Sequence, residues 1–158
     1  GINGFIDFAE ASEGWDLSRI AIGATLTGCD ELEPKASPNR MRITAIARAK
    51  RHGFRTFVSV EPIPAGMFDR ALSVIALSYP FVDLFKIGLQ SGQKYTKKET
   101  LGFYYDVADY WNTHDGKPRI YWKDSIVNAA GLDRETLPGY CVPANYDLFN
   151  ENNNENAV

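Results

Sequence analysis

The sequence has 158 residues, of which 44% are hydrophobic and 23% are charged, and its formal net charge is −3. These values are typical of a globular domain that buries a core without disulfide bonds, so one β/α domain is expected over residues 1–149, followed by a disordered Asn/Glu-rich tail over residues 150–158. The acidic balance argues against a broad nucleic-acid-binding surface, and no apolar run reaches the roughly 18 residues of a membrane span.

Helices and strands alternate from the start of the chain. The end of a short helix is expected over residues 5–11, and a strand over residues 19–27. This strand is mostly apolar without clean alternation, which is typical of a strand covered on both faces. Ser37 followed by proline provides an N-cap and a favoured first helical residue, and predicts a helix over residues 38–52 that ends at Gly53. The expected apolar stripe of this helix is formed by Met41, Ala45, Ile46 and Ala49.

The same alternation continues to the last third of the chain. Strands are expected over residues 55–61, 81–88 and 119–122, helices over residues 64–78 and 96–114, and an irregular segment over residues 133–149. Pro62 is expected to stop the first of these strands. Thr96 and Glu99 form a capping box at the start of the long helix, whose buried face is expected to include Tyr105 and Trp111.

The order of these elements predicts an α/β fold. Strands that alternate with helices form right-handed crossovers and a parallel sheet, here a β/α repeat that makes about half of a TIM-like barrel. Such a partial barrel leaves a sheet edge with unpaired backbone groups. We therefore expect a homodimer, or a larger assembly, in which that edge is partly covered.

Polar side chains gather where the predicted strands end. They are Thr25, Thr27, Ser59, Glu61, Lys86, Lys123 and Asp124. In a barrel these ends converge on one mouth, where active sites collect, and a carboxylate with two lysines suits an anionic or zwitterionic ligand. The alternative is that these side chains are solvated or bound by neighbouring loops.

Two catalytic hypotheses follow from the charged strand ends. A strand-borne lysine such as Lys86 can form a Schiff base with a carbonyl substrate, as in a barrel-type lyase; the alternative is an ion pair with Glu61 or Asp83. Borohydride trapping with candidate carbonyl compounds tests the Schiff base. Glu61 and Glu33 are candidate carboxylates for a glycoside hydrolase, a hypothesis that depends on their separation.

The cysteine content predicts a reduced, cytoplasmic protein without a metal site. The only two cysteines, Cys29 and Cys141, are far apart in the sequence. Zinc and iron–sulfur sites usually need three or four clustered ligands. Incidental thiols are therefore the favoured interpretation, ahead of a disulfide.

A longer pattern resembles a known enzyme family. A threonine-rich strand precedes Glu33-Pro34, a helix that opens with an arginine ends in a glycine turn, and a Ser-x-Glu-Pro strand follows. The segments that carry this pattern are residues 25–34, 42–43, 49–54 and 56–63, with weaker likeness over residues 83–88 and 120–125. They resemble the second half of a radical S-adenosylmethionine enzyme, in the branch similar to spore photoproduct lyase.

The resemblance implies a partial (β/α)6 barrel with S-adenosylmethionine as its cofactor. By position, the ribose and methionine part of the cofactor would lie near Thr25, Thr27, Ser59 and Glu61. Arg42 would meet the methionine carboxylate, and Ile63 and Ile87 would pack near the adenine. Lys86 completes the set of candidate cofactor-binding residues.

One departure from the family limits this reading. The family binds a [4Fe–4S] cluster through a Cys-x3-Cys-x2-Cys loop, and the chain has no such triplet. We expect the C-terminal part or a cluster-less relative of such an enzyme, not catalytically competent alone, whose partner would be the N-terminal half. The alternatives are a non-catalytic binding or assembly domain and a barrel-type lyase or hydrolase that uses Lys86 or Glu61. A Cys-x3-Cys-x2-Cys loop upstream in the encoding reading frame would favour the first hypothesis over the second.

Overall fold

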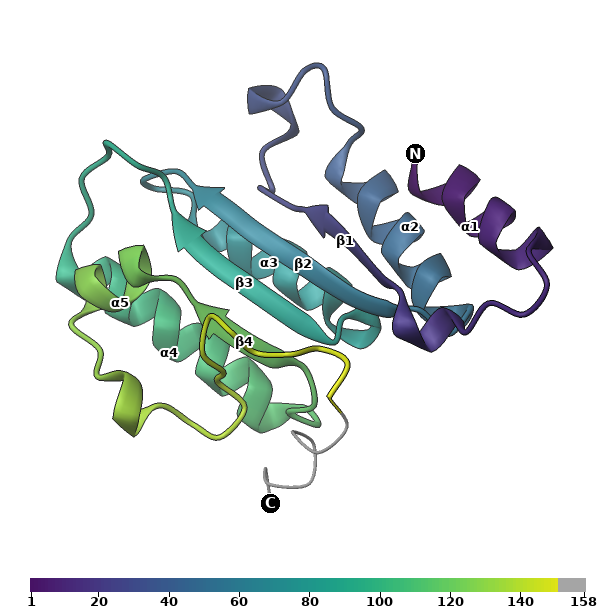
Figure 1. Cartoon of the computed structure of the whole chain (residues 1–158). Coiled ribbons are helices and arrows are strands. Elements are labelled where there is room, and N and C mark those ends of the chain that lie inside the picture. The colour runs from purple at the N-terminus through teal and green to yellow at the C-terminus, as the bar shows by residue number, and fades with distance from the viewer. Residues whose placement is uncertain (151–158) are drawn as a thin grey trace.

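The computed structural model describes residues 1–150, so the predicted tail lies outside the described residues except for its first residue. The fold is α/β, as expected, with one open, four-stranded, fully parallel sheet in the order β1-β2-β3-β4 (Figure 1). The strands are β1 (Ala21–Thr25), β2 (Arg55–Ile63), β3 (Leu84–Leu89) and β4 (Arg119–Trp122). The helices are α1 (Ile2–Ala11), α2 (Asn39–Arg51), α3 (Phe68–Ser78), α4 (Lys97–Thr113) and α5 (Asp124–Ala130).

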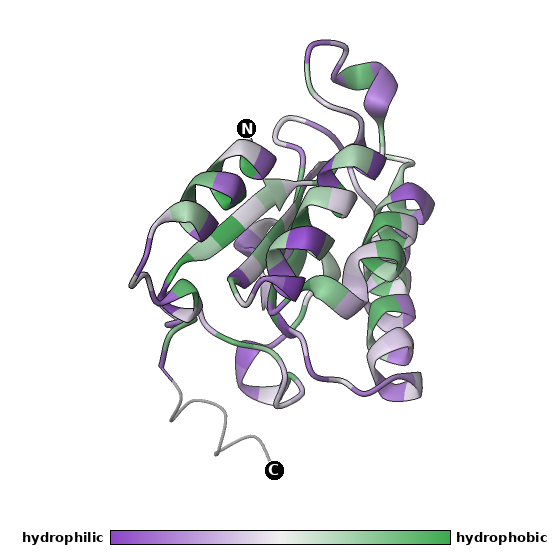
Figure 2. Cartoon of the chain, turned by 90° about the vertical axis from the view of Figure 1, so that its right-hand side faces the viewer, coloured by the Kyte–Doolittle hydropathy of each residue, from purple (hydrophilic) through white to green (hydrophobic). Residues whose placement is uncertain are grey.

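The core lies between the sheet and the helices. In β2 the side chains of Val58 and Val60 are fully buried, whereas those of Phe57 and Ser59, which alternate with them, are only partly buried. Successive side chains of a strand point to opposite faces, so the buried set faces the helices. Figure 1 shows α2 and α3 behind the strands, and Figure 2 shows hydrophobic strand segments beside helices whose ribbons alternate between hydrophobic and hydrophilic residues.

The other face of the sheet, called the open face below, carries no helix. Parallel pairing keeps register partners on the same face, which places there the residues Ala21, Gly23, Thr25, Arg55, Phe57, Ser59, Leu84, Lys86, Arg119 and Tyr121. Residues 138–150, called the C-terminal segment below, cross the lower part of this face in front of β4 (Figure 1). The upper part, at the carboxyl ends of the strands, stays uncovered by that segment.

Three local expectations were wrong. β2 continues through Pro62 to Ile63, because the register with β3 shifts between Val60 and Ile63, where a proline that cannot donate is tolerated. Helix α5 was not expected; it is a short helix that ends in the left-handed Gly131. Met41 and Tyr105 are 63% and 59% exposed, because tertiary packing buries a narrower stripe of each helix than the sequence suggested.

The two edges of the sheet differ. The outer edge of β4 is paired with the C-terminal segment: the Ile120 amide donates to the Tyr140 carbonyl at 2.9 Å, and the Val142 amide donates to the Ile120 carbonyl at 2.8 Å. Within residues 1–150, β1 pairs with β2 alone. The free edge of the described sheet is therefore the β1 edge.

None of the helices described over residues 1–150 has both the length and the apolar character to cross a bilayer.

Candidate functional site

The register of the sheet brings three of the expected strand-end residues into one row on the open face. Thr25 pairs with Ser59, Ser59 with Lys86, and Lys86 with Tyr121. Neighbouring strands are about 4.8 Å apart, so the four side chains form a continuous polar row across the sheet. Tyr121 was not singled out in the sequence, although its alternation with buried Ile120 and Trp122 was a usable signal.

The hydroxyls of Thr25 and Ser59 are free polar groups of this row. Thr25 is exposed and Ser59 is half-buried. Within residues 1–150, neither side-chain oxygen makes a hydrogen bond to protein. Both can therefore donate to and accept from a ligand on the open face.

An ion pair lies one step nearer the carboxyl ends of the strands. Glu61 of β2 pairs with Lys123, which follows β4. The pair passes over Gly88 of β3, where an added Cβ would lie 2.8 Å from Lys123 Cδ and 3.2 Å from Glu61 Oε2. Glycine at position 88 thus makes room for the pair, which bridges β2 and β4 across β3.

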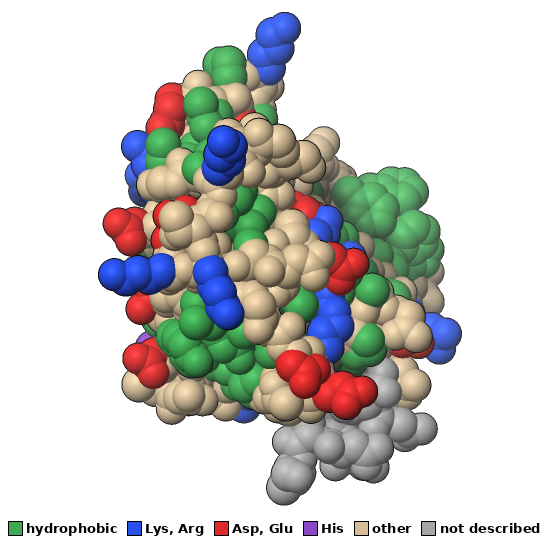
Figure 3. Space-filling view, turned by 90° about the vertical axis from the view of Figure 1, so that its left-hand side faces the viewer, with side chains coloured by type: hydrophobic (Ala, Val, Ile, Leu, Met, Phe, Trp, Pro, Cys, Tyr) green, Lys and Arg blue, Asp and Glu red, His purple; other side chains and the backbone are tan. Residues whose placement is uncertain are grey.

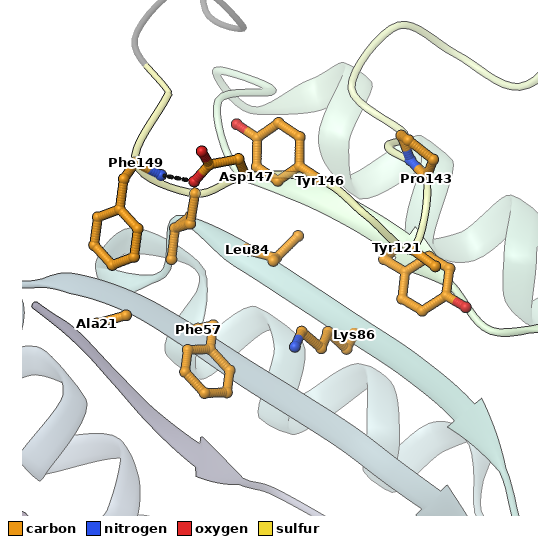
Figure 4. Close-up of a pocket in the computed structure, with 11 residues that line it drawn as sticks. Ala21, Phe57, Leu84, Lys86, Tyr121, Pro143, Tyr146, Asp147 and Phe149 are labelled. Carbon is orange, nitrogen blue, oxygen red and sulfur yellow. Dashed lines mark hydrogen bonds between the residues drawn. The ribbon is translucent and has the colours of Figure 1, made fainter.

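Lys86 has neither of the ionic partners considered from the sequence. Glu61 pairs with Lys123, and Asp83 pairs with Lys50. The Lys86 ammonium instead lies over the Phe57 ring, 4.8 Å from the ring centroid. Its side chain points along the open face toward Phe57 and away from the carboxyl end of β3 (Figure 4).

Thr27 and Arg42 brace the loop that follows β1. Arg42 donates to Glu33 Oε2 at 2.8 Å and to the Thr25 carbonyl at 2.7 Å, and Thr27 Oγ1 donates to the same Glu33 oxygen at 2.6 Å. The Arg42 guanidinium, with the Thr27 hydroxyl, holds the pKa of Glu33 below its usual value. Glu33 is thus bound within this network and Glu61 is paired with Lys123. These two residues therefore do not form the free carboxylate pair that the glycoside hydrolase hypothesis needs.

Ile63 and Ile87 belong to the core. Both side chains have 0% exposure, and Ile87 lies with Phe85 on the helix-facing side of β3. A ligand on the open face cannot reach the Ile87 side chain without displacing the strand. The structure thus gives these residues a packing role, and the adenine contact implied by the family resemblance has no exposed surface at either position.

The charges of the open face differ from those of the whole chain. The strands and the residue after β4 present Arg55, Lys86, Arg119 and Lys123 on this face, against the single carboxylate of Glu61. The chain as a whole has a net charge of −3. On the α4–α5 side of the molecule, by contrast, acidic and basic side chains are mixed (Figure 3). The strands therefore give the open face an excess of positive charge, which favours an anion there.

The two thiols are poor metal ligands. Within residues 1–150, no group of three His, Cys, Asp or Glu side chains is arranged to hold a metal ion. Cys29 is fully buried and unpaired, and burial raises its pKa. Burial also raises the pKa of the Cys141 thiol to about 11. Because the thiolate is the metal-binding form, both cysteines are in the wrong protonation state at neutral pH.

Comparisons of this chain with protein-family models, with curated proteins and with solved structures gave no match.

Proposed function

We propose that this chain is the C-terminal part of a barrel of the radical S-adenosylmethionine type, whose open face binds the organic part of the cofactor at the carboxyl ends of β1 and β2. The observation that carries the proposal is the pair of hydroxyls on Thr25 and Ser59, adjacent in register and without protein partners among the described residues. Such hydroxyls suit a ribose or a carboxylate, both of which exchange hydrogen bonds with them. The two unpaired thiols fit a cytoplasmic setting.

The Glu61–Lys123 pair supports the same ligand. The Glu61 side chain is 25% exposed and that of Lys123 is 38% exposed, so both charged groups remain accessible from the open face. A zwitterion with an ammonium and a carboxylate, such as the methionine part of the cofactor, can be matched by such a pair. Arg42 is already bound to Glu33 and to the Thr25 carbonyl. The groups that would bind the methionine carboxylate are therefore the Thr25 and Ser59 hydroxyls and Lys123.

The iron–sulfur cluster of the resembled family does not fit the residues present. The chain has two cysteines where the family loop has three, and both are poor ligands at neutral pH. In that family the cofactor supplies radical chemistry once the cluster reduces it. We expect this chain alone to bind the cofactor without cleaving it, and cluster ligands would have to come from outside this sequence.

Titration calorimetry with S-adenosylmethionine tests the proposed site. The chain is expected to bind with a Kd on the order of 0.1–1 mM, since a half barrel covers one side of the ligand. Ser59→Ala should weaken binding about tenfold, because one hydrogen bond to a charged or polar ligand group is lost. Ser73→Ala, a change on the outer side of α3, should leave the Kd unchanged. Absence of binding to the unaltered chain, or equal Kd values for both variants, would contradict the proposal.

The free edge of β1 supports self-association. The Ile20 carbonyl accepts from the Arg55 amide at 3.0 Å, and the Leu26 amide donates to the Ser59 carbonyl at 2.9 Å, so the even-numbered residues of this strand face β2. The backbone groups of Ala21, Gly23 and Thr25 therefore point to the outer edge, where Arg42 binds the Thr25 carbonyl. An edge with such groups pairs readily with another strand. A homodimer through β1 is the assembly we propose for the chain alone.

Ala21→Pro is expected to convert the dimer into a monomer. The Ala21 amide points to the outer edge, so proline removes no bond to β2, and the preceding Ile20 is extended (φ −115°, ψ 128°), as a residue before proline prefers. Sedimentation velocity at micromolar protein measures the mass. Ala24→Pro, which removes an amide directed at β2, should unfold the domain instead. A monomeric mass for the unaltered chain would refute the dimer.

A further inference from the structure

A cavity on the open face extends from Lys86 and Tyr121 of the polar row toward the amino ends of the strands. It lies between the sheet and the C-terminal segment, is partly open to solvent and has a volume of about 250 Å³. Figure 4 shows its floor formed by side chains of the strands and its roof by side chains of the segment. The lining residues used below are Phe57, Leu84, Lys86, Tyr121, Tyr146, Asp147 and Phe149.

The walls of this cavity are mainly aromatic and aliphatic. Phe57 and Leu84 rise from β2 and β3, while Tyr146 and Phe149 descend from the C-terminal segment (Figure 4). An apolar protein cavity of about 150 Å³ is known to hold a benzene molecule. A cavity of about 250 Å³ therefore has room for a ring with one small substituent.

One cation, the Lys86 ammonium, lines the cavity without an ion-pair partner among residues 1–150. Among residues 1–150 the Lys86 ammonium makes no ion pair, and its contact is with the face of the Phe57 ring. The side chain is half-buried, so its charge is only partly screened by solvent. A bound anion would gain a charge-assisted hydrogen bond from this ammonium.

The cavity also has an acidic residue, which restricts the charge of the ligand. Asp147 lies on the exposed C-terminal segment, and its Oδ1 accepts the Phe149 amide at 2.9 Å. A ligand with two or more negative charges would be repelled by this carboxylate. Because Asp147 is exposed and Lys86 is half-buried, solvent screens the carboxylate more than the ammonium, which favours a single negative charge on an apolar body.

We infer that this cavity binds a small monocarboxylate with an aromatic or similarly compact apolar body, its carboxylate against Lys86 and its ring between Phe57 and the C-terminal segment. The site adjoins the proposed cofactor site at Lys86 and Tyr121 of the polar row, but it lies toward the amino ends of the strands, and Ser59 and Thr25 do not line it. It does not depend on cofactor binding. In this arrangement the C-terminal segment is the wall that completes the site.

Benzoate, benzamide and benzylamine, titrated separately against the chain and followed by NMR chemical shifts, test this inference. They share a ring and differ in charge. Benzoate is expected to bind at least about tenfold more tightly than either of the others, with the largest shifts at Phe57 and Tyr146. Comparable binding of benzamide, tighter binding of benzylamine, or no binding of benzoate would overturn the inference.

Lys86→Met keeps the aliphatic stem and removes the charge, so it should weaken benzoate binding at least about tenfold while leaving benzamide binding unchanged. Lys98→Met, on the exposed side of α4, is the matched control and should leave benzoate binding unchanged. Tyr146→Ala removes part of the roof and should weaken both ligands. Ser59→Ala should not alter benzoate affinity, which separates failure of this site from failure of the cofactor site. Unchanged benzoate affinity in Lys86→Met would overturn the assignment.

Discussion

Replacing Trp111 with alanine is expected to lower the free energy of unfolding by about 3–5 kcal/mol. The indole is 1% exposed and its Nε1 donates to the Pro118 carbonyl at 2.8 Å. Its ring centroid lies 4.9 Å from that of Tyr79, 5.4 Å from that of Phe85 and 6.1 Å from that of Tyr140. The substitution therefore leaves a large cavity and an unpaired carbonyl where α4, β3 and the C-terminal segment meet.

Urea denaturation followed by circular dichroism measures this loss. Tyr105→Ala on the same helix is the matched control, because Tyr105 is 59% exposed and its removal should change the free energy of unfolding by no more than about 0.5 kcal/mol. Because Trp111 contacts Tyr140, the Trp111→Ala substitution should also displace the C-terminal segment and thereby weaken benzoate binding. Similar free energies for the two variants would show that this aromatic cluster is not the centre of the core.

Replacing Gly28 with alanine is expected to lower the free energy of unfolding by about 2–4 kcal/mol, the combined cost of a left-handed backbone and of overpacking. Gly28 has φ +73°, and an added Cβ would lie 2.8 Å from the carbonyl oxygen of Arg70. Neither partner in that contact is the end of a flexible side chain, so the backbone itself has to move. The loop after β1, which holds the Arg42–Glu33 network, would be displaced as a result.

Gly53→Ala separates the two contributions. Gly53 also has a left-handed backbone, with φ +92°, but an added Cβ would meet no atom within 4 Å. Its substitution should cost about 1–2 kcal/mol from backbone strain alone. Thermal or urea unfolding of the two variants gives the difference, which is the cost of the contact with Arg70. Equal losses would mean that the α3 backbone moves aside freely.

Sequence patterns that span only a few residues were enough to predict much of the fold. The N-cap half of the capping box is confirmed, since Thr96 Oγ1 accepts the Glu99 amide at 3.1 Å; the Glu99 carboxylate accepts from the Thr96 hydroxyl at 3.0 Å, and not from the Thr96 amide as in a full capping box. The alternation of helix and strand likewise predicted a parallel α/β sheet, because a parallel connection needs a crossover. The end of β2 was misjudged at Pro62, because tolerance of a proline there depends on the register with a neighbouring strand.

Only part of the candidate site could be predicted from such local sequence signals. Thr25, Ser59 and Lys86 were expected at strand ends, and the parallel register does align them in one row. Arg42 and Thr27 were chosen by the same reasoning, yet they bind Glu33 within the loop. Ile87 was chosen by position, and alternation along β3 buries it among the helices. Residue type and spacing therefore indicated which groups were polar and near a strand end, but not which face or partner each would have.

The parallel α/β architecture, the polar ends of the strands and the lack of three cysteines for a cluster can all be read from the amino acids alone, since each follows from composition or from short-range pattern. The pairing of Glu61 with Lys123, the turn of Lys86 toward Phe57 and the cavity beneath the C-terminal segment come only with the folded chain. Each of these depends on register between strands or on residues far apart in sequence, and no local propensity carries that information.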